Sequence, residues 1–382
     1  MEKALLGKKI LVLYTAHTIG HKRIAENISY WLAQAGAQIE LREVLKSNPS
    51  PAVKYFLRVH VWVNTHAPWL WKFLYLWGFW FTMMPLRLPV AWLQKTEIEK
   101  IITEVAPDVV LTTQTSPSAV LSVLKKARRY TGMWGVAFSD YHFHRGWVYP
   151  RADFYLTNID SQAENLARLG VSPERIFRVG FALPPLPLER RADLRQQFSI
   201  PLEARVLLIG SGSLGVRLPK DLLKLCEDVV ARLSQEQVDV RVVVACGRSV
   251  EVLAELQEAS KSRSWLIPVS FYDPMSDLYQ IADVFMTKPG GLSVAEAGQF
   301  GLPLVVTHTL PGQEDLNLLY LEAGGYVTSL VHVPHEEWSA RVAAMLLGSS
   351  QNNATRSDFL QVLVPAQLSH IGGFLAGLFH VN

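Results

Sequence analysis

The chain has 382 residues, enough for two domains of ordinary size, and 49% of them are hydrophobic against 19% charged. This balance excludes intrinsic disorder, and a net charge of +3 is too weak to indicate nucleic-acid binding, although it suits an anionic membrane surface. With only Cys226 and Cys246, neither a disulfide framework nor a cysteine-based zinc site is expected.

The first half of the chain alternates strand and helix patterns. No apolar signal-peptide core precedes the first strand, so a cytoplasmic protein is expected. Apolar runs predict strands at residues 10–14, 39–44, 108–112, 135–138, 154–157 and 176–179. Residues 22–35, 98–105, 118–130 and 161–169 have helical patterns. Continuous apolar strands are typical of a parallel sheet covered on both faces.

An aromatic segment, residues 53–93, interrupts this alternation. Its tryptophans are Trp62, Trp69, Trp71, Trp77, Trp80 and Trp92. The uncharged run 73–86 is shorter than the roughly 20 residues that a membrane-spanning helix needs. Tryptophan and basic residues around an apolar body favour an element that lies in the membrane interface. The alternative is a buried helical pair or an oligomer interface.

The second half begins after a proline-rich linker at residues 183–188. Strands are predicted at 206–209, 240–245, 265–269, 283–286 and 304–307, with helices between them, a polar break at 349–357 and a helical apolar tail at 359–379. The chain is therefore predicted to be α/β, with two doubly wound units.

Residues 287–317 contain two polar loops after adjacent predicted strands. Gly290 and Gly291 break the first strand, and Ser293 with Glu296 forms a predicted capping box. A helix N-terminus after such a turn favours an anion, and the ends of adjacent parallel strands are where open sheets bind ligands. The alternative is a structural β–turn–α unit that needs glycine for packing.

This stretch resembles the donor-binding region of glycosyltransferases that include monogalactosyldiacylglycerol synthases, processive diacylglycerol glucosyltransferases and MurG. The matching residues are 288–296, 301–303 and 311–314, with Asn317. The resemblance implies the GT-B fold: two Rossmann-like domains facing a cleft, with a C-terminal helix that returns to the first. The expected domains are 1–183, which holds the acceptor and the membrane segment, 184–350, which binds the donor, and the returning helix 355–382.

The resemblance also implies a UDP-sugar site in the second domain. Glu296 would bind the ribose hydroxyls and Phe271 would lie against the uracil. The residues expected at the diphosphate and the transferred sugar are Gly212, Ser213, Gly215, Gly290, Gly291, Leu292, Ser293, Gln313, Glu314 and Asn317. Arg248 can neutralise phosphate, or it is simply a surface residue. Because the chain has no Asp-x-Asp pair, no metal and no cofactor are expected, and helix N-termini would stabilise the leaving diphosphate.

His21 is the candidate base of the first domain, although a lone histidine is more often a packing or capping residue. A neutral imidazole can take a proton from an attacking hydroxyl. Gly20 and His21 match the end of the family's glycine-rich loop, but Thr18 and Ile19 replace two of its glycines.

A polar loop after the strand at 135–138 carries the second catalytic candidate. Asp140 could act as base or orient His21, and His144 with Trp147 is similar to the family's acceptor-side motif. Metal binding by His142 and His144 lacks a further ligand nearby. The alternative is an ordinary polar loop whose aspartate serves as a cap.

The expected function is inverting transfer of a hexose from a UDP-sugar to a lipid hydroxyl, of diacylglycerol or a glycosylated form of it. The protein would lie peripherally on the cytoplasmic face of an anionic membrane, with Trp69, Trp71, Trp77 and Trp80 in contact with it. The alternatives are a UDP-sugar 2-epimerase-like enzyme and a non-catalytic UDP-sugar binder at the membrane. The sequence does not choose the sugar, the number of sugars added or the oligomeric state.

Overall fold

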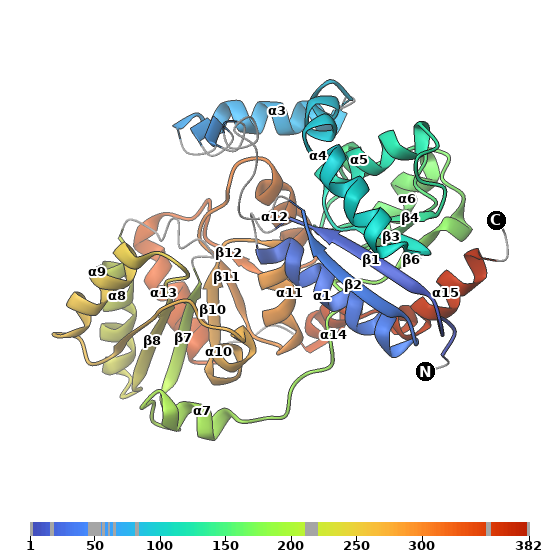
Figure 1. Cartoon of the computed structure of the whole chain (residues 1–382). Helices are drawn as coiled ribbons and strands as arrows, with labels where there is room; N and C mark the ends of the chain where they lie inside the picture. Colours follow the sequence, from blue (N-terminus) through green and yellow to red (C-terminus); the bar gives the residue numbers. More distant parts are fainter. Residues whose placement is uncertain are drawn as a thin grey trace. The chain divides into compact units, whose positions relative to one another are not determined.

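The computed structural model describes residues 3–15, 19–44, 55, 58–59, 62–63, 66–80, 84–210, 221–348 and 353–379. The chain divides into two compact units. Unit 1 consists of Met1–Pro184, Pro311–Leu316 and Gln361–Asn382, and unit 2 of Pro185–Leu310 and Asn317–Leu360. Figure 1 shows both units with most of their helices and strands labelled.

Unit 1 is built on a six-stranded parallel sheet in the order β2-β1-β3-β4-β5-β6. Its strands are β1 (Lys9–Tyr14), β2 (Gln38–Glu43), β3 (Val109–Thr112), β4 (Met133–Ala137), β5 (Phe154–Thr157) and β6 (Ile176–Arg178). The strand order reverses between β1 and β3, which pair in register from Ile10 opposite Val109. The six strands predicted for this half are confirmed.

The helices of unit 1 follow the predicted alternation. They are α1 (Ile19–Gln34), α3 (Pro68–Trp80), α4 (Met84–Val105), α5 (Thr115–Lys126), η1 (Arg145–Trp147), α6 (Asp160–Arg168), η2 (Pro173–Arg175), η3 (Ala366–His370) and α15 (Ile371–Leu378). One hydrophobic core joins α4 and α5 to β1, β3, β4 and β5. The helix expected at 98–105 is the last part of the longer helix α4.

Residues 361–379 pack on unit 1 through close backbone approaches. At Gly180 the backbone φ is +59°, and a Cβ atom there would lie 2.3 Å from the carbonyl oxygen of Leu363. Next to it, the Phe181 amide donates to that same oxygen at 3.1 Å. A Cβ atom on Gly372 would lie 2.5 Å from Cβ of Ala35, so α15 lies directly against the end of α1. The tail therefore contributes to the fold of unit 1.

Unit 2 contains the second six-stranded parallel sheet, in the order β12-β11-β10-β7-β8-β9. Its strands are β7 (Arg205–Gly210), β8 (Val240–Ala245), β9 (Leu266–Val269), β10 (Val284–Thr287), β11 (Leu304–Val306) and β12 (Thr328–Ser329). The strand order reverses between β7 and β10. With two parallel sheets covered by helices, the predicted fold class of two doubly wound units is confirmed.

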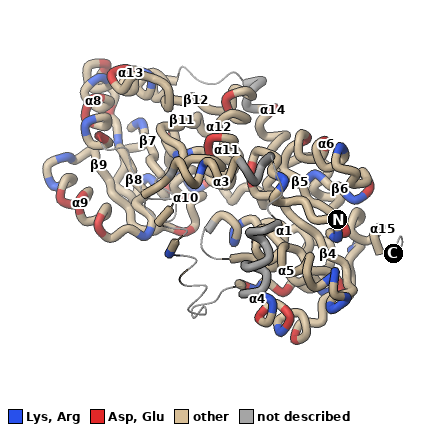
Figure 2. Tube along the Cα trace, turned by 90° about the horizontal axis from the view of Figure 1, so that it is seen from above, with Lys and Arg blue, Asp and Glu red and all other residues tan. Residues whose placement is uncertain are grey.

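The remaining helices belong mainly to unit 2. They are α7 (Arg191–Gln197), α8 (Leu222–Gln235), α9 (Val250–Ser260), α10 (Met275–Ile281), α11 (Gly291–Gln299), α12 (Gln313–Ala323), α13 (His335–Leu346) and α14 (Asn353–Leu363). Apolar residues of α8 and α13 share one core with β7 and β8. Figure 2 shows charged positions on α8, α9 and α13, whereas β10 and β11 carry none.

The C-terminal region differs from prediction in two ways. Helix α14 already begins at Asn353, so only residues 349–352 of the expected polar break lie outside the described part. The stretch Ser357–Leu378 is long and apolar enough to cross a membrane, but 47% of its most apolar window is buried in the protein. It is also divided near Pro365 into α14, η3 and α15.

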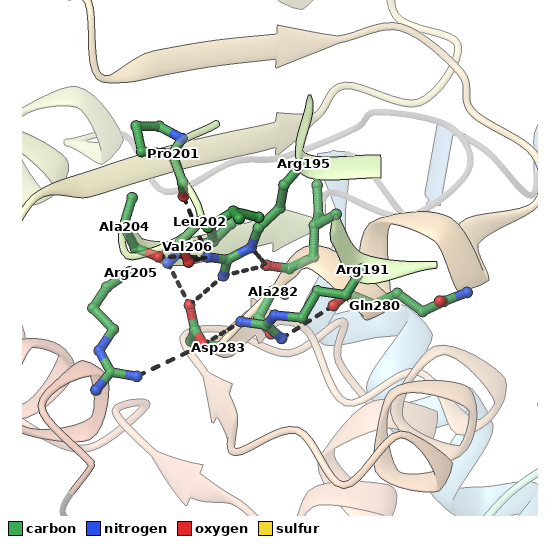
Figure 3. Close-up of polar contacts among 11 residues, drawn as sticks. Arg191, Arg195, Pro201, Leu202, Ala204, Arg205, Val206, Gln280, Ala282 and Asp283 are labelled. Atoms are coloured by element: carbon green, nitrogen blue, oxygen red, sulfur yellow. Dashed lines mark hydrogen bonds and ion pairs between the residues drawn. The ribbon is translucent and has the colours of Figure 1, made fainter. Parts of the chain in front are cut away.

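Asp283 is the centre of a polar cluster that fixes α7, a helix that was not predicted, to the sheet of unit 2 (Figure 3). The buried guanidinium of Arg195 donates to Asp283 Oδ2 at 2.9 Å and to the carbonyl oxygen of Ile281 at the same distance. Arg191 donates to Asp283 Oδ1 at 2.6 Å, and the Val206 amide donates to Oδ2 at 2.8 Å. These contacts compensate the cost of burying the charges.

Candidate active site

His21 lies where the strand order of unit 1 reverses. Helix α1 begins at Ile19, so Gly20 and His21 belong to its first turn rather than to a loop as predicted. Beyond the end of β3, the Thr113 hydroxyl donates to the His21 carbonyl oxygen at 3.3 Å. Such a reversal is the place where open α/β sheets bind ligands. Thr18, one of the departures from the family's glycine run, lies outside the described residues.

The surroundings of His21 favour a neutral imidazole. Burial lowers the pKa of His21 below its ordinary value near 6.5, and the negative charge of Asp140 opposes this effect. Its Nδ1 atom is buried and has no hydrogen-bond partner among the described residues. A ring that is neutral near pH 7 has the protonation state that a general base requires, and the charge of Asp140 favours the imidazolium that forms when the ring accepts a proton.

Asp140 follows β4 and is 4% exposed. Gln313, in the segment Pro311–Leu316 of unit 1, donates its Nε2 hydrogens to Oδ1 at 2.8 Å and to Oδ2 at 2.9 Å. The Ser139 hydroxyl donates to Oδ2 at 3.1 Å. Hydrogen bonds of this kind stabilise an ionised carboxylate and fix its orientation. The sequence predicted separate roles for Asp140 and Gln313, whereas in the structure their side chains are hydrogen-bonded to each other.

Two side chains, Asn158 after β5 and Gln162 on α6, donate hydrogen bonds to the backbone of the loop after β4. Gln162 is fully buried and donates through Nε2 to the carbonyl oxygens of Asp140 at 2.8 Å and His142 at 2.9 Å. Its Oε1 accepts from the Asn158 amide at 2.8 Å, and the Asn158 side chain donates to the Asp140 carbonyl at 3.2 Å. Sequence reasoning missed both residues, because a polar residue between β5 and α6, or within the short helix α6, gives no sign that it will be buried.

His142 and His144 both contact Tyr75, which lies on the aromatic helix α3. The Tyr75 hydroxyl lies 2.8 Å from Nε2 of His142. The Gly146 amide donates to Nδ1 of His144 at 2.8 Å, so Nε2 of His144 carries the proton and donates to the Tyr75 carbonyl at 3.1 Å. These bonds occupy nitrogens that a metal ion would need. No group of three or more His, Cys, Asp or Glu in the described ranges is placed to hold a metal.

Trp147 is 5% exposed and forms part of the wall around His21. Its ring lies 6.4 Å from the imidazole of His21 and stacks at 5.5 Å on Phe138. His144 is also only 4% exposed. Of these two predicted acceptor residues, Trp147 therefore packs near His21, whereas His144 contacts Tyr75.

Helix α3 presents different side chains on its two faces. Trp69 is 71% exposed and Phe73, one turn later, is 56% exposed. Trp71 is half-buried, and its ring lies 6.2 Å from that of Tyr75. The side chains of Trp77 and Trp80 lie outside the described set. Helix α3 thus has an exposed aromatic face, and Tyr55 and Trp62 of the same predicted membrane segment are exposed as well.

In unit 2, the predicted donor loop follows β10 at the reversal of strand order. The Gly290 amide donates to the Lys288 carbonyl at 2.8 Å, and α11 begins at Gly291. Thr287 donates to the carbonyl of Gly210 at 3.3 Å, which joins the ends of β10 and β7. Gly212, Ser213 and Gly215 lie outside the described residues.

The predicted capping box at Ser293 is wrong. The N-cap of α11 is Gly290, which has no side-chain cap, so Ser293 already lies in the first turn of the helix. Leu292 is buried within the same turn. The first amides of a helix lack intrahelical acceptors, so this terminus remains suited to an anion.

The other predicted donor residues are divided between the two units. Buried Asn317 donates to the Pro289 carbonyl at 3.1 Å and so holds the β10–α11 loop. Tyr279 donates to Oε2 of Glu296 at 3.4 Å. The Arg248 guanidinium lies 4.9 Å from the ring centre of Phe271, which is 40% exposed. Glu314 is buried and, like Gln313, belongs to the segment grouped with unit 1.

Two Rossmann-like units, each with polar residues at its strand-order reversal, define the class of GT-B proteins. The family model for monogalactosyldiacylglycerol (MGDG) synthase matches residues 21–183, and that for the glycosyltransferase family 28 C-terminal domain matches residues 206–336. The chain belongs to this family of GT-B glycosyltransferases.

Two relatives are processive diacylglycerol beta-glucosyltransferases. The chain is 25% identical over 272 residues to that of Bacillus licheniformis, a match covering 68% of this chain and 66% of the relative. It is 28% identical over 253 residues to that of Bacillus subtilis, covering 65% and 63%. The matches thus span just under two thirds of these relatives.

Solved structures support the fold. MurG of Acinetobacter baumannii superposes with a TM-score of 0.54 at 14% identity, over 97% of this chain and 99% of that one. A putative UDP-N-acetylglucosamine 2-epimerase from Listeria monocytogenes gives 0.59 at 13% identity, over 98% and 97%. Identities this low establish the shared fold alone.

Proposed function

We propose that the protein is an inverting glycosyltransferase that moves a hexose from a UDP-sugar to the hydroxyl of diacylglycerol or a glycosylated diacylglycerol. The observation that carries this proposal is the double family match, with diacylglycerol glucosyltransferases among the relatives. Buried, neutral His21 beside Asp140 supports the chemistry, because that pair is suited to accepting a proton from a hydroxyl.

In the proposed reaction, a residue of unit 1 accepts the proton of the acceptor hydroxyl. The acceptor oxygen attacks the anomeric carbon of the sugar as its proton passes to the imidazole of His21. The bond from that carbon to the β-phosphate oxygen breaks, and UDP leaves with the electron pair. Asp140 stabilises the imidazolium that forms, as its charge favours protonated His21. A direct displacement inverts the anomeric configuration.

Unit 2 would bind the donor. The N-terminus of α11 at Gly291 supplies amides and a positive dipole end for the diphosphate. Glu296 would accept hydrogen bonds from the ribose, and Phe271 would flank the uracil. We propose that this arrangement works without a metal or cofactor, since helix amides can stabilise the leaving diphosphate.

We further propose that the protein acts at the cytoplasmic face of a membrane, to which it binds peripherally. The support is the exposed aromatic face of α3, with Trp69 and Phe73, in a segment whose only charged residues are basic. Aromatic side chains insert into the interfacial region and basic side chains favour anionic lipid.

The decisive experiment is incubation with diacylglycerol vesicles and a panel of UDP-sugars, followed by mass spectrometry of the lipid. With at least one donor, the mass of the lipid is expected to increase by one or more hexoses. The same increase should be absent with the variant His21→Ala. Wild-type protein that binds UDP but transfers no sugar would instead support a binding module. An epimerase shares the fold, as the Listeria structure illustrates, and would convert the free UDP-sugar without any lipid.

A further inference from the structure

Tyr75 makes three contacts, with His142 and His144 of the loop after β4 and with a separate segment of unit 1. Its hydroxyl lies 2.8 Å from His142 Nε2, and its ring lies 4.6 Å from that of His144. Its carbonyl accepts the Nε2 proton of His144 at 3.1 Å. Burial and the charge of Asp140 raise the pKa of Tyr75 well above its usual value, so the phenol stays neutral at physiological pH. The third contact is with the segment Pro311–Leu316.

Gly312 in that segment lies directly against Tyr75. A Cβ atom on Gly312 would lie 3.1 Å from Cβ of Tyr75 and 3.2 Å and 3.3 Å from its ring atoms Cγ and Cδ1, and the φ of +94° at Gly312 is also unfavourable for any other residue. Asp315 fixes the turn by accepting from the Gly312 amide at 3.1 Å. Lys72, one turn before Tyr75 on α3, pairs with Asp315 at 2.9 Å. Helix α3 thus holds the segment by packing and by charge.

The segment in turn holds Asp140. Gln313, next to Gly312 in the sequence, donates to both carboxylate oxygens of Asp140. A contiguous series of contacts therefore runs from Tyr75 through the segment to Asp140, whose charge acts on His21.

We propose that Tyr75 is a positioning residue that holds Pro311–Leu316 in place, so that Gln313 keeps the carboxylate of Asp140 in its orientation. Tyr75 itself touches no reacting atom in this scheme. The catalytic consequence rests on the proposed function, whereas the positioning contact does not. The aromatic helix then has two roles, one on each face: a surface of exposed aromatics, and an inner face that supports the base.

The test compares Tyr75→Ala and Tyr75→Phe with Tyr30→Ala, a matched exposed tyrosine on α1 outside this series of contacts. Amide hydrogen exchange is measured on peptides that cover residues 311–316. Tyr75→Ala is expected to speed exchange there by about tenfold, whereas Tyr75→Phe, which keeps the ring, stays within about twofold of wild type. Tyr30→Ala should leave the segment unchanged.

Activity gives the second readout. Tyr75→Ala is expected to lower kcat by about tenfold and to leave the KM for the UDP-sugar within about twofold, since unit 2 is untouched. Adding Gln313→Ala should lower kcat no further, because Tyr75 acts through Gln313. Recovery of kcat in Tyr75→Phe is expected, as the ring carries the packing.

The proposal would be overturned if Tyr75→Ala exchanges at residues 311–316 as slowly as Tyr30→Ala does. It would also be overturned if the losses of kcat caused by Tyr75→Ala and Gln313→Ala multiply fully in the double variant. If Tyr75→Ala does not fold, Lys72→Met is tested instead. It removes the ion pair between the half-exposed Lys72 of α3 and Asp315 of the segment, and it must also speed exchange in the segment. If wild-type protein transfers no sugar to any lipid, the proposed function fails, and the exchange measurement alone still decides whether Tyr75 holds the segment.

Discussion

Nε2 of Gln313 lies 2.8 Å and 2.9 Å from the two carboxylate oxygens of Asp140, although 173 positions separate the residues in the sequence. An amide that bridges both oxygens fixes the plane of the carboxylate as well as its charge. The resemblance to known transferases implied that Gln313 binds the transferred sugar. In this structure its amide is a partner of the candidate catalytic aspartate.

Gln313→Ala should therefore reduce kcat more than it reduces donor affinity. Hydrogen bonds to a charged group contribute about 1.5–3 kcal/mol, which corresponds to a loss of about tenfold or more. Calorimetry with UDP, which lacks the transferred hexose, should show a Kd within about twofold of wild type. A large rise in the KM for the UDP-sugar with an unchanged kcat would return Gln313 to the sugar-binding role.

The pH profile of transfer should report His21. Because burial lowers its pKa below the ordinary value near 6.5, the neutral base persists to mildly acidic pH. The acid limb of kcat/KM is therefore expected below about pH 6.5. In Asp140→Asn the opposing charge is lost, so the limb should move to still lower pH while the rate falls. A limb that moves upward would contradict the electrostatic role assigned to Asp140.

Glu296→Gln should weaken UDP binding by about tenfold, because a charged acceptor for the ribose hydroxyls is lost. Titration calorimetry with UDP measures this directly and needs no lipid. Glu322→Gln, an exposed carboxylate on α12, is the matched control and should leave the Kd unchanged. Equal affinities for both variants would remove Glu296 from the donor site.

Trp69→Ala combined with Phe73→Ala should reduce flotation of the protein with anionic vesicles by tenfold or more. Burying a large apolar side chain contributes roughly 1.5–3 kcal/mol, and both of these are exposed in the structure. Leu188→Ala removes an apolar side chain of the linker that is 87% exposed, more than either Trp69 or Phe73, and should not change flotation. Undiminished flotation of the double variant would place membrane contact elsewhere.

Arg195→Met should lower the free energy of unfolding by about 3–5 kcal/mol, because it leaves a partly buried carboxylate with fewer partners. Denaturant unfolding followed by circular dichroism measures the change. Arg205→Met tests the same carboxylate from its exposed side, at 3.9 Å from Asp283, and should cost less than about 1 kcal/mol. Similar losses in both variants would mean that burial is not what makes Arg195 important.

The sheets could be predicted because their strands are apolar runs that report burial locally. Helix α7 was missed, since Arg195 becomes a core residue only through Ile281 and Asp283, more than 80 positions away. The cap at Ser293 was wrong because Gly290 lets the helix begin a turn earlier.

The candidate site was predictable residue by residue, but its connections were not. His21 and Asp140 each follow a strand, where polar residues stand out against apolar surroundings. Tyr75 gave no such signal, because a tyrosine within an aromatic segment looks like its neighbours. Its partner His142 lies 67 positions further along the chain, and contacts at such separations are set by tertiary packing.

Unit 1 is assembled from three separate stretches of the chain, the last of which includes α15. During synthesis, the Gly372 contact with α1 and the Leu363 contact with Phe181 cannot form until nearly the whole chain has left the ribosome. Unit 2, encoded between these stretches, is free to complete its sheet earlier. The half of the protein that carries the proposed base is thus the last to mature, so a chain terminated before residue 361 would lack the last stretch of unit 1.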